Sequence, residues 1–73
     1  MTRVVIAEDE AIIRLDLKET LQEEGYEVVG ETSRGDEAVE LVSTLHPDLA
    51  ILDIKMPGMD GLEAARAITA EPA

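Results

Sequence analysis

Short apolar segments alternate along the chain with longer amphipathic ones. The run from Val4 to Ala7 is apolar and rich in β-branched residues, which predicts a buried strand. Leu49 to Asp53 is a second short apolar run, of the kind found in parallel strands that are covered on both faces. Between them, Tyr26 to Gly30 carries two adjacent valines and indicates a weaker strand. The pattern therefore predicts three strands.

Helical periodicity fills the intervals between these strands. From Ala11 to Glu24, apolar residues at 13, 17 and 21, with 12 and 15 beside them, recur at helical spacing. Gly25 follows, at the position where a helix commonly ends in a left-handed conformation. A second apolar stripe, at positions 38, 41, 42 and 45, stops at His46, which precedes a proline. Both stripes are expected to pack against the sheet.

Capping signals mark the second helix and predict a third. Ser33, followed three residues later by Asp36, resembles a capping pair at the start of the second helix. Asp60, with Glu63 three residues later, predicts the start of a third helix, which Pro72 ends. The order strand, helix, repeated three times, predicts an α/β fold with a parallel sheet and right-handed crossovers.

Carboxylates follow two of the predicted strands. Glu8 and Asp9 come directly after the first strand, and Asp53 closes the third. In an open parallel sheet the ligand crevice lies beyond the carboxyl ends of the strands, where the strand order reverses. If the first strand lies between the other two, in the order 2-1-3, the three carboxylates converge there. Such a cluster either raises the pKa values of its members or binds a cation.

Composition restricts the kind of cation. The sequence has no cysteine, and its single histidine, His46, is predicted at the far end of the second helix, so a soft transition-metal site is not expected. Carboxylate oxygens and water suit Mg²⁺, which leaves coordination positions open for phosphate oxygens. A carboxylate beside such an ion can attack a phosphoryl group and form an aspartyl phosphate. The cluster therefore indicates phosphoryl chemistry.

Length and charge restrict the class of protein. With 73 residues the chain forms one domain at most, and a chain this short buries only about 60% of its unfolded surface. Seventeen acidic residues against six basic ones give a net charge of −11, which argues against direct binding to nucleic acid or to an anionic membrane. The sequence has no apolar run of membrane-spanning length and no signal-peptide pattern, so a cytoplasmic protein is expected.

Two motifs carry a resemblance to a known family. "VVIAEDE" and "DLAILDIKMPGMDGLEA" resemble the N-terminal part of a bacterial response-regulator receiver domain, and the resemblance extends over the whole chain. It implies a three-layer flavodoxin-like fold and a sensor histidine kinase as phosphodonor. It also implies that Asp53 is the phosphoacceptor and Asp9 a Mg²⁺ ligand, with Glu8 assisting through the ion or its water. The backbone carbonyl of Lys55 would be a further ligand. The stretch "AEDEAIIRLDLKETLQEEGYEVVGE" is similar to the receiver halves of regulators that end in an RNA-binding antiterminator module.

The sequence departs from the family pattern in two respects. Glu8 stands where aspartate is commoner. Residues 1–73 contain about three of the family's five strand-helix units, so we expect a single partial receiver domain without the fourth and fifth units. The Ser or Thr after the fourth strand and the lysine after the fifth are then absent. Because phosphoryl transfer depends on such electrostatic stabilisation, phosphorylation is expected to be impaired.

Two alternative functions come from other classes. Without a fourth strand, the apolar segment Leu49 to Leu52 is an open edge, which predicts self-association, for example as a dimer. The chain could then be a non-catalytic assembly module built on half of a receiver. A Mg²⁺-dependent phosphohydrolase with an aspartate nucleophile ranks last, because its dehalogenase-like version requires Asp-x-Asp and position 55 is lysine. The first interpretation is a signalling domain, not an enzyme.

Overall fold

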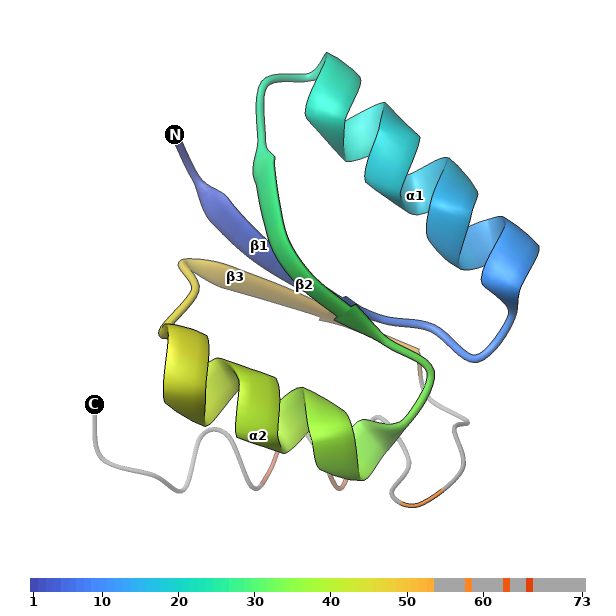
Figure 1. The fold of residues 1–73 in the computed structure, drawn as a ribbon, viewed down its shortest axis with the longest axis vertical. Coiled ribbons are helices and arrows are strands. Elements are labelled where there is room, and N and C mark those ends of the chain that lie inside the picture. Colours follow the sequence, from blue (N-terminus) through green and yellow to red (C-terminus); the bar gives the residue numbers. More distant parts are fainter. Residues whose placement is uncertain (54–57, 59–62, 64–65, 67–73) are drawn as a thin grey trace.

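The alternating order of strands and helices predicted from the sequence is confirmed. The computed structural model describes residues 1–53, 58, 63 and 66. Its elements are β1 (Arg3–Ala7), α1 (Ala11–Glu23), β2 (Glu27–Thr32), α2 (Gly35–Leu45) and β3 (Leu49–Leu52) (Figure 1). The third helix expected to end at proline 72 falls largely outside the described residues.

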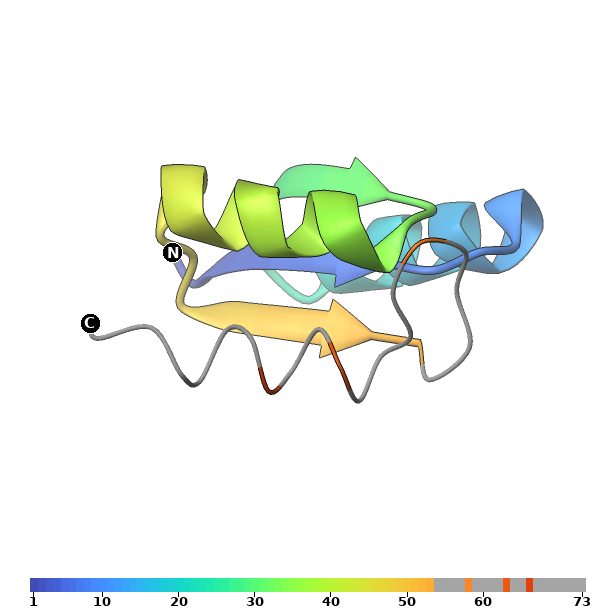
Figure 2. The same ribbon diagram turned by 90° about the horizontal axis from the view of Figure 1, so that it is seen from below.

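The three strands form one parallel sheet in the order β2-β1-β3, as predicted for a flavodoxin-like fold. Figure 2 shows the three arrows pointing the same way, so that the carboxyl ends of the strands lie at one edge. The register between β1 and β3 is regular and ends with Ala7 opposite Leu52. Between β1 and β2 the register shifts: Val4 is paired with Val28, but Val5 is paired with Gly30. Val29 is therefore an extra residue on β2.

The central strand is the core of the molecule. The side chains from Val4 to Ala7 are all buried, because β1 has a neighbouring strand on both edges and a helix over each face (Figure 1). Ala7 packs with Ala38 of α2 and with the half-buried Leu52 of β3. Ala7 and Leu52 thus face α2. Because side chains alternate along a strand, Ile6 points to the opposite face, on which α1 packs.

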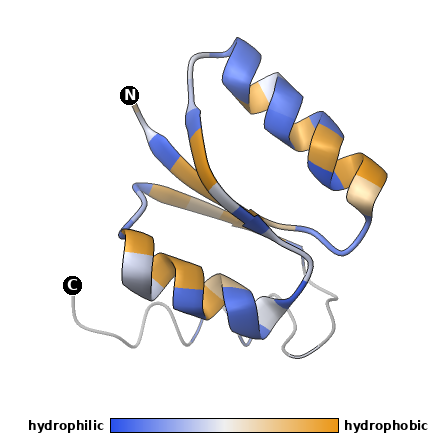
Figure 3. Cartoon of the chain, in the orientation of Figure 1, coloured by the Kyte–Doolittle hydropathy of each residue, from blue (hydrophilic) through white to orange (hydrophobic). Residues whose placement is uncertain are grey.

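Helix α1 packs more loosely than its apolar stripe predicts. Leu17 and Leu21 are half-buried, but Ile13 remains 46% exposed, so its expected burial is wrong. Ile12 and Leu15 are 84% and 55% exposed. Among the described elements α1 contacts β1 and β2 but not β3, which leaves one side of the helix without a packing partner. Figure 3 shows hydrophobic segments, in orange, alternating with hydrophilic ones, in blue, along α1.

The ends of the two helices confirm two predictions and correct one. Gly25 has a φ of +91°, and His46 ends α2 in the left-handed region, as expected at helix ends. The predicted capping by Ser33 is wrong. Arg34 precedes the first residue of α2, and no side chain caps the helix. The hydroxyl of Thr32 accepts a hydrogen bond from Arg34 N–H at 3.1 Å, which turns the chain one residue later than the capping pattern requires.

None of the described helices has the length and apolar character needed to cross a membrane.

Candidate functional site

The carboxyl end of β1 leads directly into the acidic pair. Glu8 is half-buried and Asp9 is exposed. The Glu8 N–H donates a hydrogen bond of 3.0 Å to the carbonyl of Thr32, so the ladder with β2 extends one residue beyond the strand. The N–H of Glu10 lies 3.4 Å from Glu8 Oε1, which is a weak contact. The backbone of Glu8 is therefore held in the plane of the sheet, and Asp9 is the first residue to leave it.

Asp53 joins this edge of the sheet from β3. Its N–H donates a hydrogen bond of 2.8 Å to the carbonyl of Ala7, which extends the parallel ladder past Leu52. Asp53 is half-buried. The sequence-based expectation that Asp53 and Glu8 follow adjacent strand ends is confirmed for the backbone. Both residues come directly after the Ala7–Leu52 pair, on its carboxyl side, at the edge where an open parallel sheet binds its ligands.

The residues at this edge suit a hard cation. The side chains of Glu8, Asp9 and Asp53 offer carboxylate oxygens as ligand atoms, the type that Mg²⁺ prefers. Within the described residues, no three His, Asp or Glu side chains form a group that could hold a metal ion. Mg²⁺ needs no such group, because it keeps several waters and commonly binds through one or two carboxylates. Asp9 and Asp53 can supply that number, whereas Lys55 lies outside the described residues. Binding by Glu8, Asp9 and Asp53 stays a prediction.

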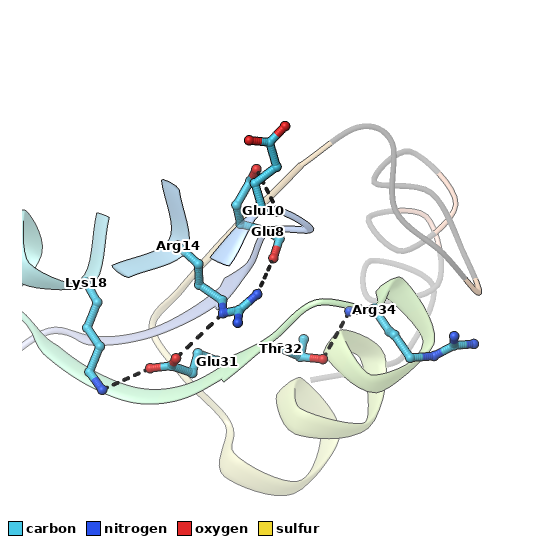
Figure 4. Close-up of polar contacts among 7 residues, drawn as sticks. All are labelled: Glu8, Glu10, Arg14, Lys18, Glu31, Thr32 and Arg34. Carbon is cyan, nitrogen blue, oxygen red and sulfur yellow. Dashed lines mark hydrogen bonds and ion pairs between the residues drawn. The ribbon is translucent and has the colours of Figure 1, made fainter. Parts of the chain in front are cut away.

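A basic pair on α1 lies beside the acidic edge and was not anticipated from the sequence. Arg14 donates from Nη1 to the carbonyl of Glu8 at 2.8 Å, and its Nε lies 3.6 Å from Glu31 Oε1 (Figure 4). Lys18 Nζ lies 3.0 Å from Glu31 Oε2. The spacing of Arg14 and Lys18 on one face of a helix was visible in the sequence. Their shared partner on β2 was not, because it depends on how α1 lies across the sheet.

A third ion pair lies where α2 begins. Arg34 and Asp36 form two hydrogen bonds of 3.0 Å each, from Nε and Nη2 to the two carboxylate oxygens. This hydrogen bonding lowers the pKa of the Asp36 carboxyl and raises the pKa of Arg34. Gly58, five residues after Asp53, lies against the pair: a β-carbon at Gly58 would be 2.5 Å from Arg34 Nη2. The pair therefore contacts the chain that follows Asp53.

Comparison with known proteins decides the family. A family model described as the response regulator receiver domain matches residues 4–73. The chain belongs to this family. Its parallel sheet in the order β2-β1-β3 is thus that of a receiver domain of two-component systems. Receiver domains generally act in signalling and not in catalysis, although some relatives of this chain are methylesterases.

Individual relatives support the assignment over nearly the whole chain. The transcriptional regulatory protein PdtaR of Mycobacterium tuberculosis is 59% identical over 69 residues, which are 94% of this chain and 34% of that protein. The chemotaxis protein CheY of Thermotoga maritima is 46% identical over 66 residues, 90% of this chain and 55% of that protein. The solved response regulator domain of Thermotoga maritima CheB matches with a TM-score of 0.92 and 37% identity. That match covers 96% of this chain and 53% of the solved one.

The chain spans between about a third and about half of the length of these relatives. The interpretation of residues 1–73 as a partial receiver with three of five strand-helix units stays a prediction.

Proposed function

We propose that Asp53 of this receiver chain accepts a phosphoryl group from a sensor histidine kinase in the presence of Mg²⁺. The observation that carries the proposal is the hydrogen bond of 2.8 Å from Asp53 N–H to the carbonyl of Ala7. It supports a site in which Asp53 stands at the same edge of the sheet as Glu8 and Asp9. Receiver domains as a class are phosphorylated by sensor histidine kinases, which supports the choice of donor.

The proposed transfer requires little of the protein besides positioning. An oxygen of the Asp53 carboxylate attacks phosphorus as the phosphorus–nitrogen bond of the donor phosphohistidine breaks, and the departing imidazole nitrogen takes up a proton. Asp9 and Asp53 would hold Mg²⁺, together with the backbone carbonyl of Lys55, and Glu8 would act through the ion or its water. When bound, the ion neutralises charge that develops on the phosphoryl oxygens.

We propose that transfer to the 73-residue chain alone is slow. This proposal assumes that residues 1–73 hold three of the family's five strand-helix units, without the hydroxyl and lysine donors that the family supplies after its fourth and fifth strands. Each preorganised donor removed from such a site commonly costs about 100- to 1,000-fold in rate. We place this phosphorylation in the cytoplasm, with the kinase as partner, and infer no direct binding of this chain to nucleic acid because of its net charge of −11.

The test is an NMR titration of the chain with Mg²⁺ and then with beryllofluoride, a mimic of the phosphoryl group. We expect backbone amide shifts centred on Glu8, Asp9 and Asp53 that are lost in Asp53→Asn. Asp16→Asn is the matched control, since Asp16 is an exposed aspartate of α1 and the substitution changes charge equally. A folded wild-type chain that shows no response to either addition would contradict the proposal. Equal loss in both variants would show that net charge, and not the site, controls binding.

We further propose that the isolated chain self-associates through β3. Leu49 of this strand is 44% exposed, and among the described strands β3 pairs only with β1. An open apolar strand edge favours pairing with a second copy. Size-exclusion chromatography with light scattering should give a mass of at least twice 7.9 kDa at high concentration, and Leu49→Lys should shift the species toward the monomer. A monomer of wild type at millimolar concentration would contradict this proposal.

A further inference from the structure

Arg14 connects helix α1 to the residue that begins the acidic edge. Its side chain is only 21% exposed, and its Nη1 donates to the backbone carbonyl of Glu8 at 2.8 Å. The contact is made to the main chain of Glu8 and not to its carboxylate, whose Oε1 makes the weak contact of 3.4 Å with the N–H of Glu10. In Figure 4 the guanidinium group of Arg14 lies between Glu8 and Glu31. Arg14 thus connects α1 to Glu8, after β1, and to Glu31, near the end of β2.

Glu31 is an ion-pair partner of this guanidinium group. Its carboxylate forms two ion pairs. Oε1 lies 3.6 Å from Arg14 Nε, and Oε2 lies 3.0 Å from Lys18 Nζ. The register shift after Val4 makes this possible, because it places Glu31 opposite Ile6, on the face of the sheet that α1 covers. With a regular register Glu31 would point to the opposite face. The carboxylate is therefore held between two cations of α1.

Both polar groups of the Glu8 backbone consequently have partners. The N–H donates to the Thr32 carbonyl at 3.0 Å, and the carbonyl accepts from Arg14 at 2.8 Å. The peptide that joins Glu8 to Asp9 contains this carbonyl. Its rotation would turn the Asp9 backbone, and with it the direction of the Asp9 carboxylate. The hydrogen bond from Arg14 opposes that rotation and does so without occupying the carboxylate.

We propose that Arg14 is a positioning residue for the Mg²⁺ site, which it serves by fixing the Glu8–Asp9 peptide while Glu31 orients the guanidinium. The proposal rests on the proposed function, because it assumes that Asp9 and Asp53 bind Mg²⁺. Residues that orient metal ligands from outside the ligand set typically change metal affinity by about 10- to 100-fold when they are replaced. We therefore expect Arg14→Met to weaken Mg²⁺ binding by about that factor.

The sign of this change separates positioning from simple electrostatics. Arg14 carries a positive charge close to the acidic edge, and that charge repels Mg²⁺. If charge alone mattered, its removal would tighten binding. Weaker binding in Arg14→Met therefore requires a role other than charge. Lys18→Met is the matched control. It removes the same charge and an ion pair with the same residue, Glu31, but the hydrogen bond to the Glu8 carbonyl comes from Arg14 and is kept.

The experiment is a Mg²⁺ titration of wild type, Arg14→Met, Lys18→Met and Arg14→Lys, followed by amide NMR at constant ionic strength. We expect affinity about 10- to 100-fold lower for Arg14→Met and within about twofold of wild type for Lys18→Met. Arg14→Lys keeps the charge but has a single nitrogen for two partners, so intermediate affinity is expected. Urea unfolding of each variant shows whether an affinity change follows global stability.

The outcomes of this titration decide two claims, the positioning role of Arg14 and the proposed function. Equal or tighter binding in Arg14→Met than in wild type overturns the positioning role of Arg14. The same loss in Lys18→Met as in Arg14→Met also overturns it, because the ion pairs and not the Glu8 contact would then be responsible. If Arg14→Met does not fold, Arg14→Lys decides, and wild-type affinity in that variant refutes the proposal. Absence of any Mg²⁺ response in wild type overturns the proposed function itself.

Discussion

Gly58 and Gly25 make a matched pair for testing how the start of α2 contacts the chain after Asp53. Both have a positive φ, +82° at Gly58 and +91° at Gly25. A β-carbon at Gly25 would meet no atom within 4 Å, whereas at Gly58 it would lie 2.5 Å from Arg34 Nη2 and 2.7 Å from Asp36 Oδ1. The stability change of Gly25→Ala therefore measures only the cost of a positive φ in a residue other than glycine. We predict that Gly58→Ala destabilises the chain more than Gly25→Ala.

The size of both effects follows from the geometry. An L-residue in the left-handed region costs about 1–2 kcal/mol. In a domain of this size that loss lowers the melting temperature by about 4–16 °C, which is the expectation for Gly25→Ala. For Gly58→Ala the same term applies, and in addition Arg34 Nη2 must retreat by about 0.9 Å to reach the 3.4 Å of ordinary contact. Because Arg34 Nη2 and Asp36 Oδ1 end flexible, exposed side chains, this movement costs little, so the excess over Gly25→Ala is expected to be small.

Thermal and urea unfolding of wild type and the two alanine variants provide the assay. The excess destabilisation of Gly58→Ala over Gly25→Ala should disappear when both are made in an Arg34→Ala, Asp36→Ala background, since the β-carbon then has room. Equal unfolding midpoints of Gly58→Ala and Gly25→Ala in the wild-type background would refute the reasoning. So would an excess that persists after the ion pair is removed.

Three further predictions concern the sheet and α2. Ile6→Ala should lower the free energy of unfolding in urea by about 2–5 kcal/mol because Ile6 is fully buried, whereas Ile12→Ala, at a position 84% exposed, should change it by less than about 0.5 kcal/mol. Gly30→Val should cost about 1–3 kcal/mol in the same assay, because even the first added carbon would lie 3.1 Å from Leu45 Cδ1; unchanged stability would show that α2 can shift freely. The lowered pKa of Asp36 contributes stability above the ordinary pKa of a carboxyl group, and this contribution is lost as pH falls through the lowered value. The unfolding midpoints of wild type and Asp36→Asn should therefore differ at neutral pH and converge in acid, and a difference independent of pH would contradict this.

Local patterns in the sequence were sufficient to predict most of the fold. The β-branched run Val4 to Ala7 and the stripe ending at Leu45 have the periods of a buried strand and of an amphipathic helix, and each forms that element. The acids after β1 and β3 were predicted to meet because parallel strands that are neighbours end at one edge of the sheet. The hydrogen bond from Asp53 to Ala7 confirms the backbone part of that prediction. These features depend on residues close together in the sequence or on a general rule of parallel sheets.

The capping prediction failed because two neighbouring hydroxyl side chains, Ser33 and Thr32, could each bind a backbone N–H before α2. Ser33 has the spacing to Asp36 that caps a helix, but the Thr32 hydroxyl accepts from Arg34 N–H and delays the start of α2. Similarly, Ile13 has the period of a buried residue and is still 46% exposed. A period specifies which residues share one face of α1, whereas the neighbouring elements determine how much of that face is covered.

Only the tertiary structure decided which charged residues of different elements form ion pairs. Glu31 reaches Arg14 because one extra residue of β2, Val29, reverses the faces to which all later residues of the strand point. Gly58 lies so close to Arg34 that an added β-carbon would be 2.5 Å from Nη2, although the two residues are far apart in the sequence. A hydrophobic period records burial along one element, but the partner of a side chain on another element depends on register and on the packing of helices across the sheet. The sequence alone therefore determined the described strands and helices, their order and the acidic residues that follow β1 and β3, and the assembled fold determined which charged residues contact one another.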